Sequence, residues 1–341
     1  MSTKASPTWD SQARHRCDPS GIAPLGYAVG DVPGKQVEMF LISWNVRFQT
    51  LPTQLDNIVA ALDGMRPDIV TLQEVSSSEV ERLVGRLAEI GLLHAYDSAA
   101  TAPEGPYGRK KYQCVIASRW PVQPRGDKWR RKAPFPELLG RATVSTPDGD
   151  LDVFTAHIPN GAGNGWRKID TFNVLSAALR RAGDEPRVLT GDFNEPRQFR
   201  RSGQIVTWGE QIYGDGGTTS PAWRDRFGDE RPGIEWTRGV RSVLAGASQH
   251  GLRDAYRTLF GFGKTPVTYR TSRGSPRCFD HTFVSRHLEV LNCGYLHEWR
   301  EAGWSDHSAM WTKLRLVPRQ PDLVEWETGS EADDEPHDDE A

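Results

Sequence analysis

The chain has 341 residues, with 42 Lys and Arg against 45 Asp and Glu, and a formal net charge of −3. This length allows one large domain or two ordinary ones, and either can bury a sizeable core. No run approaches the ~18 apolar residues of a membrane span. The first 17 residues also lack the apolar centre of a secretory leader, so we expect neither feature.

Charge is distributed unevenly along the chain. Residues 322–341 hold ten acids and no Lys or Arg, so residues 1–321 carry a net charge of +7 within the total of −3. A basic body favours an anionic partner. The acidic tail, taken as residues 318–341, has the composition of a disordered segment. It is interpreted as a solubilising end or, alternatively, as a weak competitor of a polyanion for the basic surface.

The cysteines are scattered and form no Cys-x-x-Cys pair; they are Cys17, Cys114, Cys278 and Cys293. A zinc knuckle or a disulfide framework is therefore not expected. This usage predicts a reducing, cytoplasmic location.

The predicted elements begin after a loose N-terminal arm, residues 1–37. Residues 39–45 form an apolar run that predicts a buried strand. Apolar residues then recur at helical spacing over residues 51–62, and Gly64 is expected to end that helix.

A second strand and helix follow directly. Residues 68–74 predict a strand that ends in an acid, and residues 76–90 carry an apolar stripe at helical spacing. Ser76 and Glu79 have the spacing of a capping box at the start of this helix.

The rest of the chain is richer in strands. Strands are predicted at 112–118, 141–145 and 151–157, a helix at 165–181, and further strands at 188–192, 278–285 and 308–316. Residues 197–240 are rich in Gly, Arg and Trp, and a stretch of that length without regular elements is usually functional or locally disordered. No repeat or linker divides residues 38–317, which we interpret as one domain with an insertion at about 197–240.

One strand end carries the sequence Gly191-Asp192-Phe193-Asn194. Residues two apart on an extended chain share a face, so Asp192 and Asn194 can converge on one ligand. Asp192 can accept a proton from water, while Asn194 can hold that water or a phosphate oxygen. The alternative is a surface turn, because these are ordinary turn residues.

Other predicted strands also end in polar residues, and strand ends can gather side chains that are distant in sequence. Taken singly, each has a structural explanation, as a solvated end, a turn amide or a core histidine. These residues are Asn45, Glu74, His157, Asn160, Asp280, Asp306 and His307.

Six motifs in this order resemble the endonuclease/exonuclease/phosphatase superfamily, which includes DNase I and exonuclease III. They are Ser43-Trp44-Asn45, Leu72-Gln73-Glu74-Val75, His157-Ile158-Pro159-Asn160, Gly191-Asp192-Phe193-Asn194, Phe279-Asp280-His281-Thr282-Phe283-Val284-Ser285 and Trp304-Ser305-Asp306-His307-Ser308. The resemblance implies a DNase I-like α/β fold, a four-layer sandwich of two packed mixed β-sheets flanked by helices. Independent analysis of the elements permits this fold without establishing it.

The resemblance also implies a metal site. Glu74, helped by Asn45, looks like the main Mg²⁺ site, with Mn²⁺ as a possible replacement, because hard cations take oxygen ligands. Asp306 resembles the second acid of the family near the metal. Several family nucleases have a further acid two residues after Asn45, where this chain has Arg47, so no second metal is expected at that corner.

The remaining catalytic roles follow from the same resemblance. Asp192, with Asn194 beside it, would orient or deprotonate the attacking water. His307, paired with Asp280, would bind the phosphate, and a carboxylate neighbour favours the charged imidazolium.

His157 and Asn160 would line the opposite wall, with His157 aiding protonation of the leaving group. Exonuclease III-type enzymes that cut abasic sites carry a tyrosine at the place of His157, whereas DNase I and the sphingomyelinases carry a histidine. The histidine argues against abasic-site repair.

The expected substrate is nucleic acid, DNA in preference to RNA, and no membrane partner is expected. Basic and aromatic residues supply candidate contacts with the phosphate backbone and the bases, although such runs are also typical of solvated loops. The candidates are Arg109, Lys128, Trp129, Arg130, Arg131, Trp166 and Arg167, supported by Lys110, Lys111, Arg125, Lys132 and Lys168. Two alternatives remain open: a phosphatase or phospholipid phosphodiesterase, and a nucleic-acid-binding protein without catalysis.

Overall fold

A computed structural model describes residues 36–245 and 247–317. The acidic tail and Cys17 lie outside these ranges, as does the predicted N-terminal arm apart from residues 36 and 37. Within the described ranges, no helix combines the length and the apolar character needed to cross a membrane.

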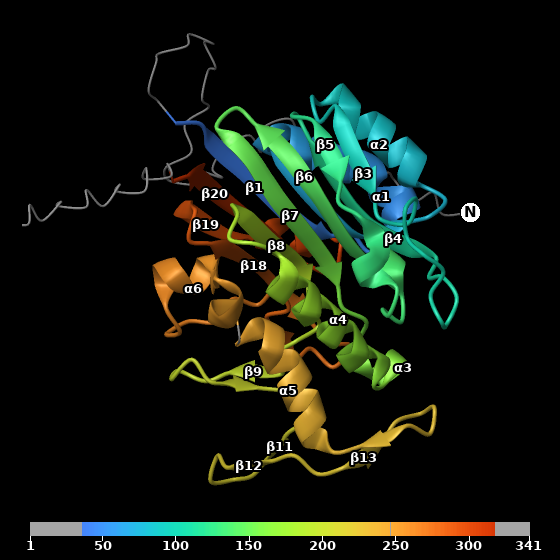
Figure 1. Cartoon of the computed structure of the whole chain (residues 1–341), viewed down its shortest axis with the longest axis vertical. Helices are drawn as coiled ribbons and strands as arrows, with labels where there is room; N and C mark the ends of the chain where they lie inside the picture. The colour runs from blue at the N-terminus through green and yellow to red at the C-terminus, as the bar shows by residue number, and fades with distance from the viewer. Residues whose placement is uncertain (1–35, 246, 318–341) are drawn as a thin grey trace, which may run out of the picture. The chain divides into compact units, whose positions relative to one another are not determined.

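Two six-stranded mixed β-sheets pack face to face at the centre of the fold (Figure 1). The first has the order β19-β20-β1-β2-β4-β3, with β1 (Glu38–Asn45), β2 (Ile69–Ser76), β3 (His94–Asp97), β4 (Tyr112–Ser118), β19 (Leu288–Leu296) and β20 (Ala309–Leu316). The second has the order β15-β18-β8-β7-β6-β5, with β5 (Val122–Pro124), β6 (Leu139–Thr146), β7 (Gly149–His157), β8 (Arg187–Asp192), β15 (Leu252–Asp254) and β18 (Asp280–Ser285). The pairs β1–β2 and β7–β8 are parallel, and the other neighbours run antiparallel.

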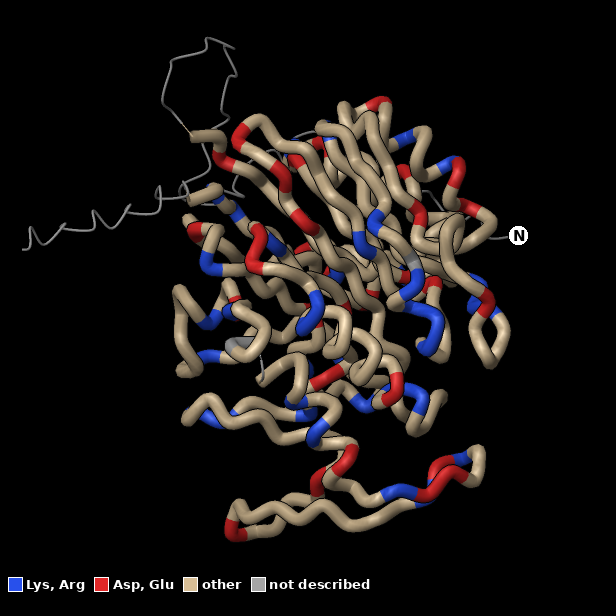
Figure 2. The backbone as a smooth tube through the Cα atoms, viewed as in Figure 1, with Lys and Arg blue, Asp and Glu red and all other residues tan. Residues whose placement is uncertain are grey.

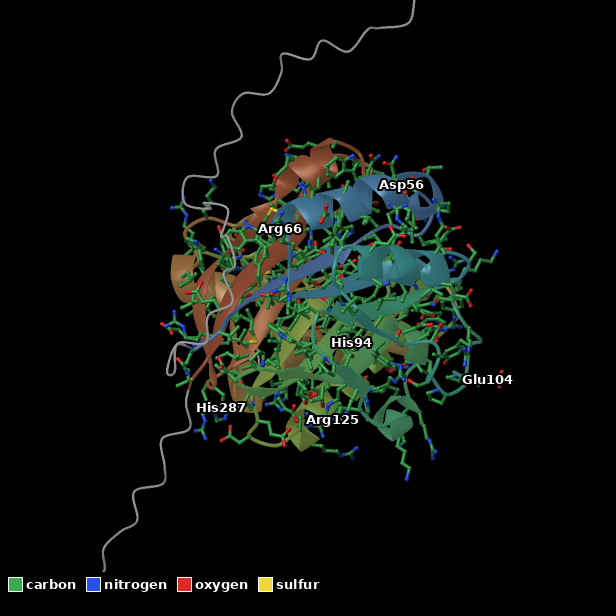
Figure 3. The ribbon with its side chains drawn as sticks, turned by 90° about the horizontal axis from the view of Figure 1, so that it is seen from above. Asp56, Arg66, His94, Glu104, Arg125 and His287 are labelled. Carbon is green, nitrogen blue, oxygen red and sulfur yellow. The ribbon has the colours of Figure 1, made fainter. Side chains whose placement is uncertain are left out.

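Helices surround the two sheets. They are α1 (Leu51–Met65), α2 (Val80–Glu89), α3 (Gly161–Asn164), α4 (Arg167–Arg181), α5 (Gly233–Leu244), α6 (Ala255–Phe260) and α7 (His297–Glu301). Helices α1 and α2 pack on the first sheet through Leu55, Leu62 and Leu83. Figure 3 shows α1, labelled at Asp56, outside the strands of that sheet. Helices α4 and α5 cover the second sheet (Figure 1). These layers confirm the predicted four-layer sandwich.

Along four strands, the side chains that face the space between the sheets change from apolar to polar. Residues two apart face the same side, so each strand presents an ordered series to its inner face, from an apolar residue through a hydroxyl to a polar end. The series are Leu41-Ser43-Asn45 in β1, Val153-Thr155-His157 in β7, Val188-Thr190-Asp192 in β8 and, against chain direction, Val284-Thr282-Asp280 in β18. The apolar residues build the core at one end, and the polar ends meet at the other.

Several predicted element boundaries are wrong. Helix α1 continues through Gly64, and Arg66 forms its C-cap in the left-handed conformation, with φ of 53°. The capping box does not form, because Ser76 belongs to β2 and Glu79 is an N-cap without a side-chain cap bond. The helix predicted at 165–181 begins at Arg167, as α4.

The insertion at 197–240 is built from three two-stranded ribbons that lead into α5. The ribbon strands are β9 (Gln198–Phe199), β10 (Ile205–Val206), β11 (Gln211–Ile212), β12 (Thr218–Thr219), β13 (Trp223–Arg224) and β14 (Glu230–Arg231), and a further ribbon joins β16 (Tyr269–Arg270) to β17 (Pro276–Arg277). Strands of two residues leave no hydrophobic period to detect, which is why the sequence did not predict them. In Figure 1 the ribbons β11–β12 and β13 lie beyond the N-terminal end of α5.

Candidate active site

Three neighbouring strands of the second sheet end side by side. The register pairs His157 of β7 with Asp192 of β8, and Asp192 with Asp280 of β18. All three residues are buried. The strand ends therefore place two carboxyl groups and an imidazole in one row, as the sequence predicted for residues that follow adjacent strands.

Asn45 connects this row to the first sheet. Its Nδ2 donates to Asp192 Oδ2 at 3.0 Å and to Glu74 Oε1 at 3.3 Å. Its own Oδ1 accepts from the Arg47 backbone N–H at 3.0 Å. One amide thus holds two carboxyl groups from different sheets toward the same point.

Glu74 reaches this point because β2 is irregular there. The register of β2 with β4 shifts between Leu72 and Val75, and Glu74 has a φ of 53°. In a regular strand Gln73 and Glu74 would face opposite sides. Here Gln73 bonds Thr155 between the sheets, while Glu74 also turns to the site and accepts from Phe48 N–H at 3.3 Å. Burial raises the pKa of Glu74, and His307 and Asn45 partly oppose that rise.

His307 and Asp280 form a buried ion pair, as the motif predicted. His307 Nδ1 lies 3.0 Å from Asp280 Oδ2, and Nε2 lies 3.7 Å from Asp192 Oδ2. Burial lowers the pKa of His307, but Asp280 and Asp192 outweigh burial and raise it to about 10. The imidazole is therefore a cation at neutral pH.

His157 is neutral, although it faces carboxylates. Its Nε2 lies 3.5 Å from Glu74 Oε1 and 3.6 Å from Asp192 Oδ2. Burial lowers its pKa to about 4, more than Asp192 raises it. The ring of Tyr112 covers it, with the centroids 5.4 Å apart. A neutral imidazole can donate a hydrogen bond but is a weak acid, so the expected transfer of a proton to a leaving group is not favoured.

Asn194 fixes the orientation of Asp192. Its backbone N–H donates to Asp192 Oδ1 at 2.8 Å, and its Nδ2 donates to Ile158 O at 2.9 Å and to Asp192 Oδ2 at 3.2 Å. Asn194 has a φ of 50°, and its carbonyl accepts from the buried Lys168 Nζ at 2.7 Å. Burial raises the pKa of Asp192, so its carboxylate is a stronger base than an exposed one.

The outer residues of the site are more exposed. Asp306 lies 3.8 Å from Arg47 Nε in a loose ion pair, and Asp306 is one of the charges acting on Glu74. Asn160 is exposed and caps α3 by accepting from Gly163 N–H at 2.7 Å.

The donor set at Glu74 fits a hard divalent cation. Two carboxyl groups, Glu74 and Asp192, converge on one amide, and Glu74 is partly exposed, which leaves room for water ligands. A second group, Asp192, Asp280 and His307, also offers ligand atoms within 4.8 Å of one another. Because His307 is protonated and bonded to Asp280, its imidazole is a poor ligand there.

The predicted nucleic-acid contacts divide into exposed and buried residues. Lys128, Arg131 and Arg109 are exposed, although Arg109 is bonded to the Ala99 and Ala102 carbonyls. The guanidinium of Arg167 lies 3.8 Å from the ring centres of both Tyr107 and Phe227. Figure 2 shows the Lys and Arg positions along the backbone.

Two of these predictions are wrong. Arg130 is fully buried and donates to the carbonyls of Ser98, Pro136 and Leu139. Trp166 is fully buried against Trp223 and Trp236. Neither side chain faces a surface that nucleic acid could reach. Trp129 is only partly buried and packs edge-on against Phe154.

The structure adds residues that the sequence did not indicate. The ring of Tyr269 lies 4.7 Å from that of His307, and Tyr269 pairs with His307 through an isolated β-bridge. Tyr112 stacks on Phe48 and packs at a tilt against His157. Both tyrosines come from elements whose spatial neighbours are distant in sequence, so no local pattern marks them.

Comparison with solved structures identifies the same fold. An AP endonuclease from Archaeoglobus fulgidus is 17% identical, with a TM-score of 0.58 over 80% of this chain and 98% of that one. A 3′ phosphatase, NExo, from Neisseria bound to product DNA hairpin is 21% identical, with a TM-score of 0.55 over 80% and 98%. D. rerio TDP2 complexed with a single-strand DNA product is 15% identical, with a TM-score of 0.55 over 81% and 98%. At these identities the likeness establishes the fold alone.

Family membership rests on the sequence. No curated protein matches the chain, but the sequence model of the endonuclease/exonuclease/phosphatase family matches residues 42–307. This range contains the first five motifs, the sixth apart from Ser308, and every strand-end residue of the cluster described above. The chain belongs to the endonuclease/exonuclease/phosphatase family.

Proposed function

We propose that this protein is a metal-dependent phosphodiesterase, a nuclease that hydrolyses DNA by in-line attack of water. The observation that carries the proposal is the convergence on Asp192 Oδ2. Asn45 Nδ2 lies 3.0 Å from this atom, His157 Nε2 3.6 Å and His307 Nε2 3.7 Å. A buried carboxylate surrounded by an amide, a neutral imidazole and an imidazolium is suited to activating water beside an anionic phosphate.

Asp192 is proposed as the general base. Its Oδ1 is held by the Asn194 N–H, so the carboxylate has a fixed orientation toward the attacking water. Burial raises its pKa, which strengthens it as a proton acceptor.

His307 is proposed to bind the phosphoryl oxygens. Asp280 fixes its ring through Nδ1 and keeps it protonated, which leaves the positive Nε2–H directed into the site. A buried cation that is already oriented stabilises the charge that develops on the phosphorane without reorganisation. His157 would donate from Nε2 as a neutral group, with Asn160 farther out.

Glu74 and Asn45, with Asp306 nearby, would hold the divalent cation, Mg²⁺ or Mn²⁺. When bound, such an ion polarises the phosphoryl oxygen and offsets charge on the leaving oxygen. Glu74 would contribute its carboxylate. Asn45 holds Glu74 and Asp192 in place through the two hydrogen bonds that its side-chain amide donates.

DNA is the proposed substrate. The exposed Lys128 and Arg131, with the half-buried Arg167, would supply phosphate contacts that give affinity without sequence choice. The NExo and TDP2 structures contain product DNA, which supports the same substrate class for this chain.

A metal-dependence assay on a panel of substrates tests the proposal. Purified protein is incubated with end-labelled single-stranded DNA, duplex DNA, RNA and phosphoinositides, each with Mg²⁺ or with EDTA. We expect DNA to be cut with Mg²⁺ and left intact with EDTA. Release of phosphate from the lipids alone would instead indicate a phosphatase, and binding of DNA without cutting would indicate a non-catalytic protein.

A further inference from the structure

The insertion forms part of the wall of an open aromatic cavity beside the catalytic cluster. The cavity has a volume of about 760 Å³ and lies between the ribbons, α3 and the loop of Asn194. Its aromatic lining consists of Trp208, Trp223, Trp236, Tyr269 and Phe279. This volume lies in the range of small-ligand sites.

The cavity is continuous with the site. Asn194, which bonds Asp192 through its backbone and side chain, lines the cavity. Tyr269 lines it as well and lies 4.7 Å from the His307 ring. A group attached to a phosphate that the catalytic residues hold would therefore lie within reach of the cavity.

Trp223 provides a prepared stacking surface. Its ring is stacked on Trp166 with a centroid distance of 4.9 Å and an angle of 23°. Trp166 is buried and does not line the cavity, whereas Trp223 does and is partly exposed. A flat ring placed on the cavity side of Trp223 would continue this stack.

Trp208 supplies a second aromatic surface, next to two arginines that lie outside the lining of the cavity. It is 41% exposed, and the guanidinium carbons of Arg197 and Arg277 lie 5.5 and 5.0 Å from its ring centre. These cations are suited to phosphates on either side of a bound base.

Of the five charged side chains that line the cavity, three are ion-paired, Asp225 accepts from backbone N–H groups, and Arg226 is exposed to solvent. Lys168 is bonded to Glu195 at 3.2 Å, and Glu210 to Arg241 at 3.0 Å. Arg224 pairs with Glu230 at 2.7 Å. The interior is therefore suited to an uncharged aromatic group, while the phosphate remains with His307.

The insertion is fastened to the body of the enzyme. Asp225 Oδ2 accepts from the Trp166 N–H at 3.1 Å, and Arg231 Nη1 donates to Asp170 Oδ1 of α4 at 2.8 Å. The aromatic surfaces are thus positioned before a ligand arrives, which reduces the entropy lost on binding.

We propose that this cavity is a subsite for one unpaired nucleobase next to the scissile phosphate, so that the enzyme prefers single-stranded DNA or an unpaired end. The inference rests on the proposed function for the identity of the phosphate. Base–aromatic stacking requires an exposed face of the base, which a base inside a duplex does not offer. Every base has such a face, so the subsite selects strandedness and not sequence.

Equilibrium binding tests the subsite without depending on cleavage. The full chain is titrated with a fluorescein-labelled single-stranded oligonucleotide in EDTA, and with an oligonucleotide of the same length whose sugars carry no bases. We expect Trp208→Ala and Trp223→Ala each to weaken binding of the normal oligonucleotide by about tenfold. Their affinity for the oligonucleotide without bases should equal that of the wild type.

Two control variants separate stacking from general damage. Phe260→Ala removes a 51% exposed aromatic on α6, outside the cavity, and should leave both affinities unchanged. Trp208→Phe should restore most of the binding that Trp208→Ala loses. Because Trp208 is 41% exposed and is not a core residue, its variants remain informative if Trp223→Ala does not fold.

Two results would overturn the subsite: unchanged binding of the normal oligonucleotide by Trp208→Ala, or equal losses with and without bases. A chain that shows the expected binding losses but never cuts DNA would retain the subsite and reject the proposed nuclease.

Discussion

The protonation state of each histidine in the site is set by the groups that contact its ring. His307 and His157 both lie buried beside Asp192, yet their pKa values move in opposite directions. His307 has Asp280 bonded to Nδ1, and this carboxylate overcomes the cost of burial. His157 has carboxylates only at 3.5 Å and beyond, and burial dominates. One ring therefore serves as a cation and the other as a neutral donor.

Substitution of Asp280 should reverse the protonation of His307. In wild-type protein, NMR titration should show His307 protonated up to about pH 10 and His157 neutral down to about pH 4. In Asp280→Asn, the His307 pKa should fall substantially, because burial then acts with less opposition. A His307 pKa unchanged by the substitution would show that Asp280 is not the cause.

The same shift has a defined effect on stability. The pKa of His307 is raised from 6.5 to about 10, so its stabilising contribution is complete below about pH 6.5 and is lost as pH rises through 10. Between about pH 6.5 and pH 10, the free energy of unfolding of the wild type should fall, relative to that of Asp280→Asn, by up to about 1.4 kcal/mol per pH unit. Chemical denaturation of both proteins at pH 7 and pH 9 measures this difference.

At the scale of secondary-structure elements, a buried ion pair between Lys168 and Glu195 holds the turn after β8 in place. Lys168 of α4 donates to the Asn194 carbonyl and pairs with Glu195, which also accepts from Trp236 of α5 at 2.9 Å. Both charged groups are fully buried, and burial lowers the pKa of Lys168 and raises that of Glu195. This pair joins two helices to the turn that orients Asp192.

Removal of one charge from this pair should destabilise the fold strongly. Lys168→Met leaves Glu195 buried without a cation, which should cost about 3–5 kcal/mol in urea denaturation. The double variant Lys168→Met/Glu195→Gln should recover much of this loss. Arg224→Met breaks the exposed pair with Glu230 and should cost less than about 1 kcal/mol. Equal costs for the two single variants would refute the buried role.

Local sequence patterns predicted where several strands end, but they did not predict features that depend on contacts distant in sequence. The strand ends at Asn45, His157 and Asp192 were predictable, because apolar runs and turn residues mark the termini of buried strands. The turn of Glu74 into the site was not, since it depends on a register shift against β4. The burial of Arg130 was not predictable either. Its guanidinium donates to the backbone carbonyls of residues 98, 136 and 139, and no local pattern links these residues to Arg130.

At the scale of the fold, residues 36–317 place the proposed catalytic centre where the two sheets meet. Each sheet alone supplies an incomplete set: the first gives Asn45 and Glu74, and the second gives His157, Asp192 and Asp280. The family motifs in the sequence predicted this meeting, and the inner-face series of the strands explains it physically. The aromatic cavity was not predictable, because its walls come from the insertion, α3 and the loop after β8.

The most direct test of this account is single-turnover hydrolysis of end-labelled single-stranded DNA by Asp192→Asn. The amide keeps the shape of the carboxylate but cannot accept the proton from water. We predict that, with Mg²⁺ present, the rate falls by about 10²–10⁴-fold or more, while circular dichroism and the urea midpoint show a folded protein. Asp150→Asn, at the exposed opposite end of β7, should cut at the wild-type rate. A folded Asp192→Asn protein that cuts as fast as wild type would contradict the account.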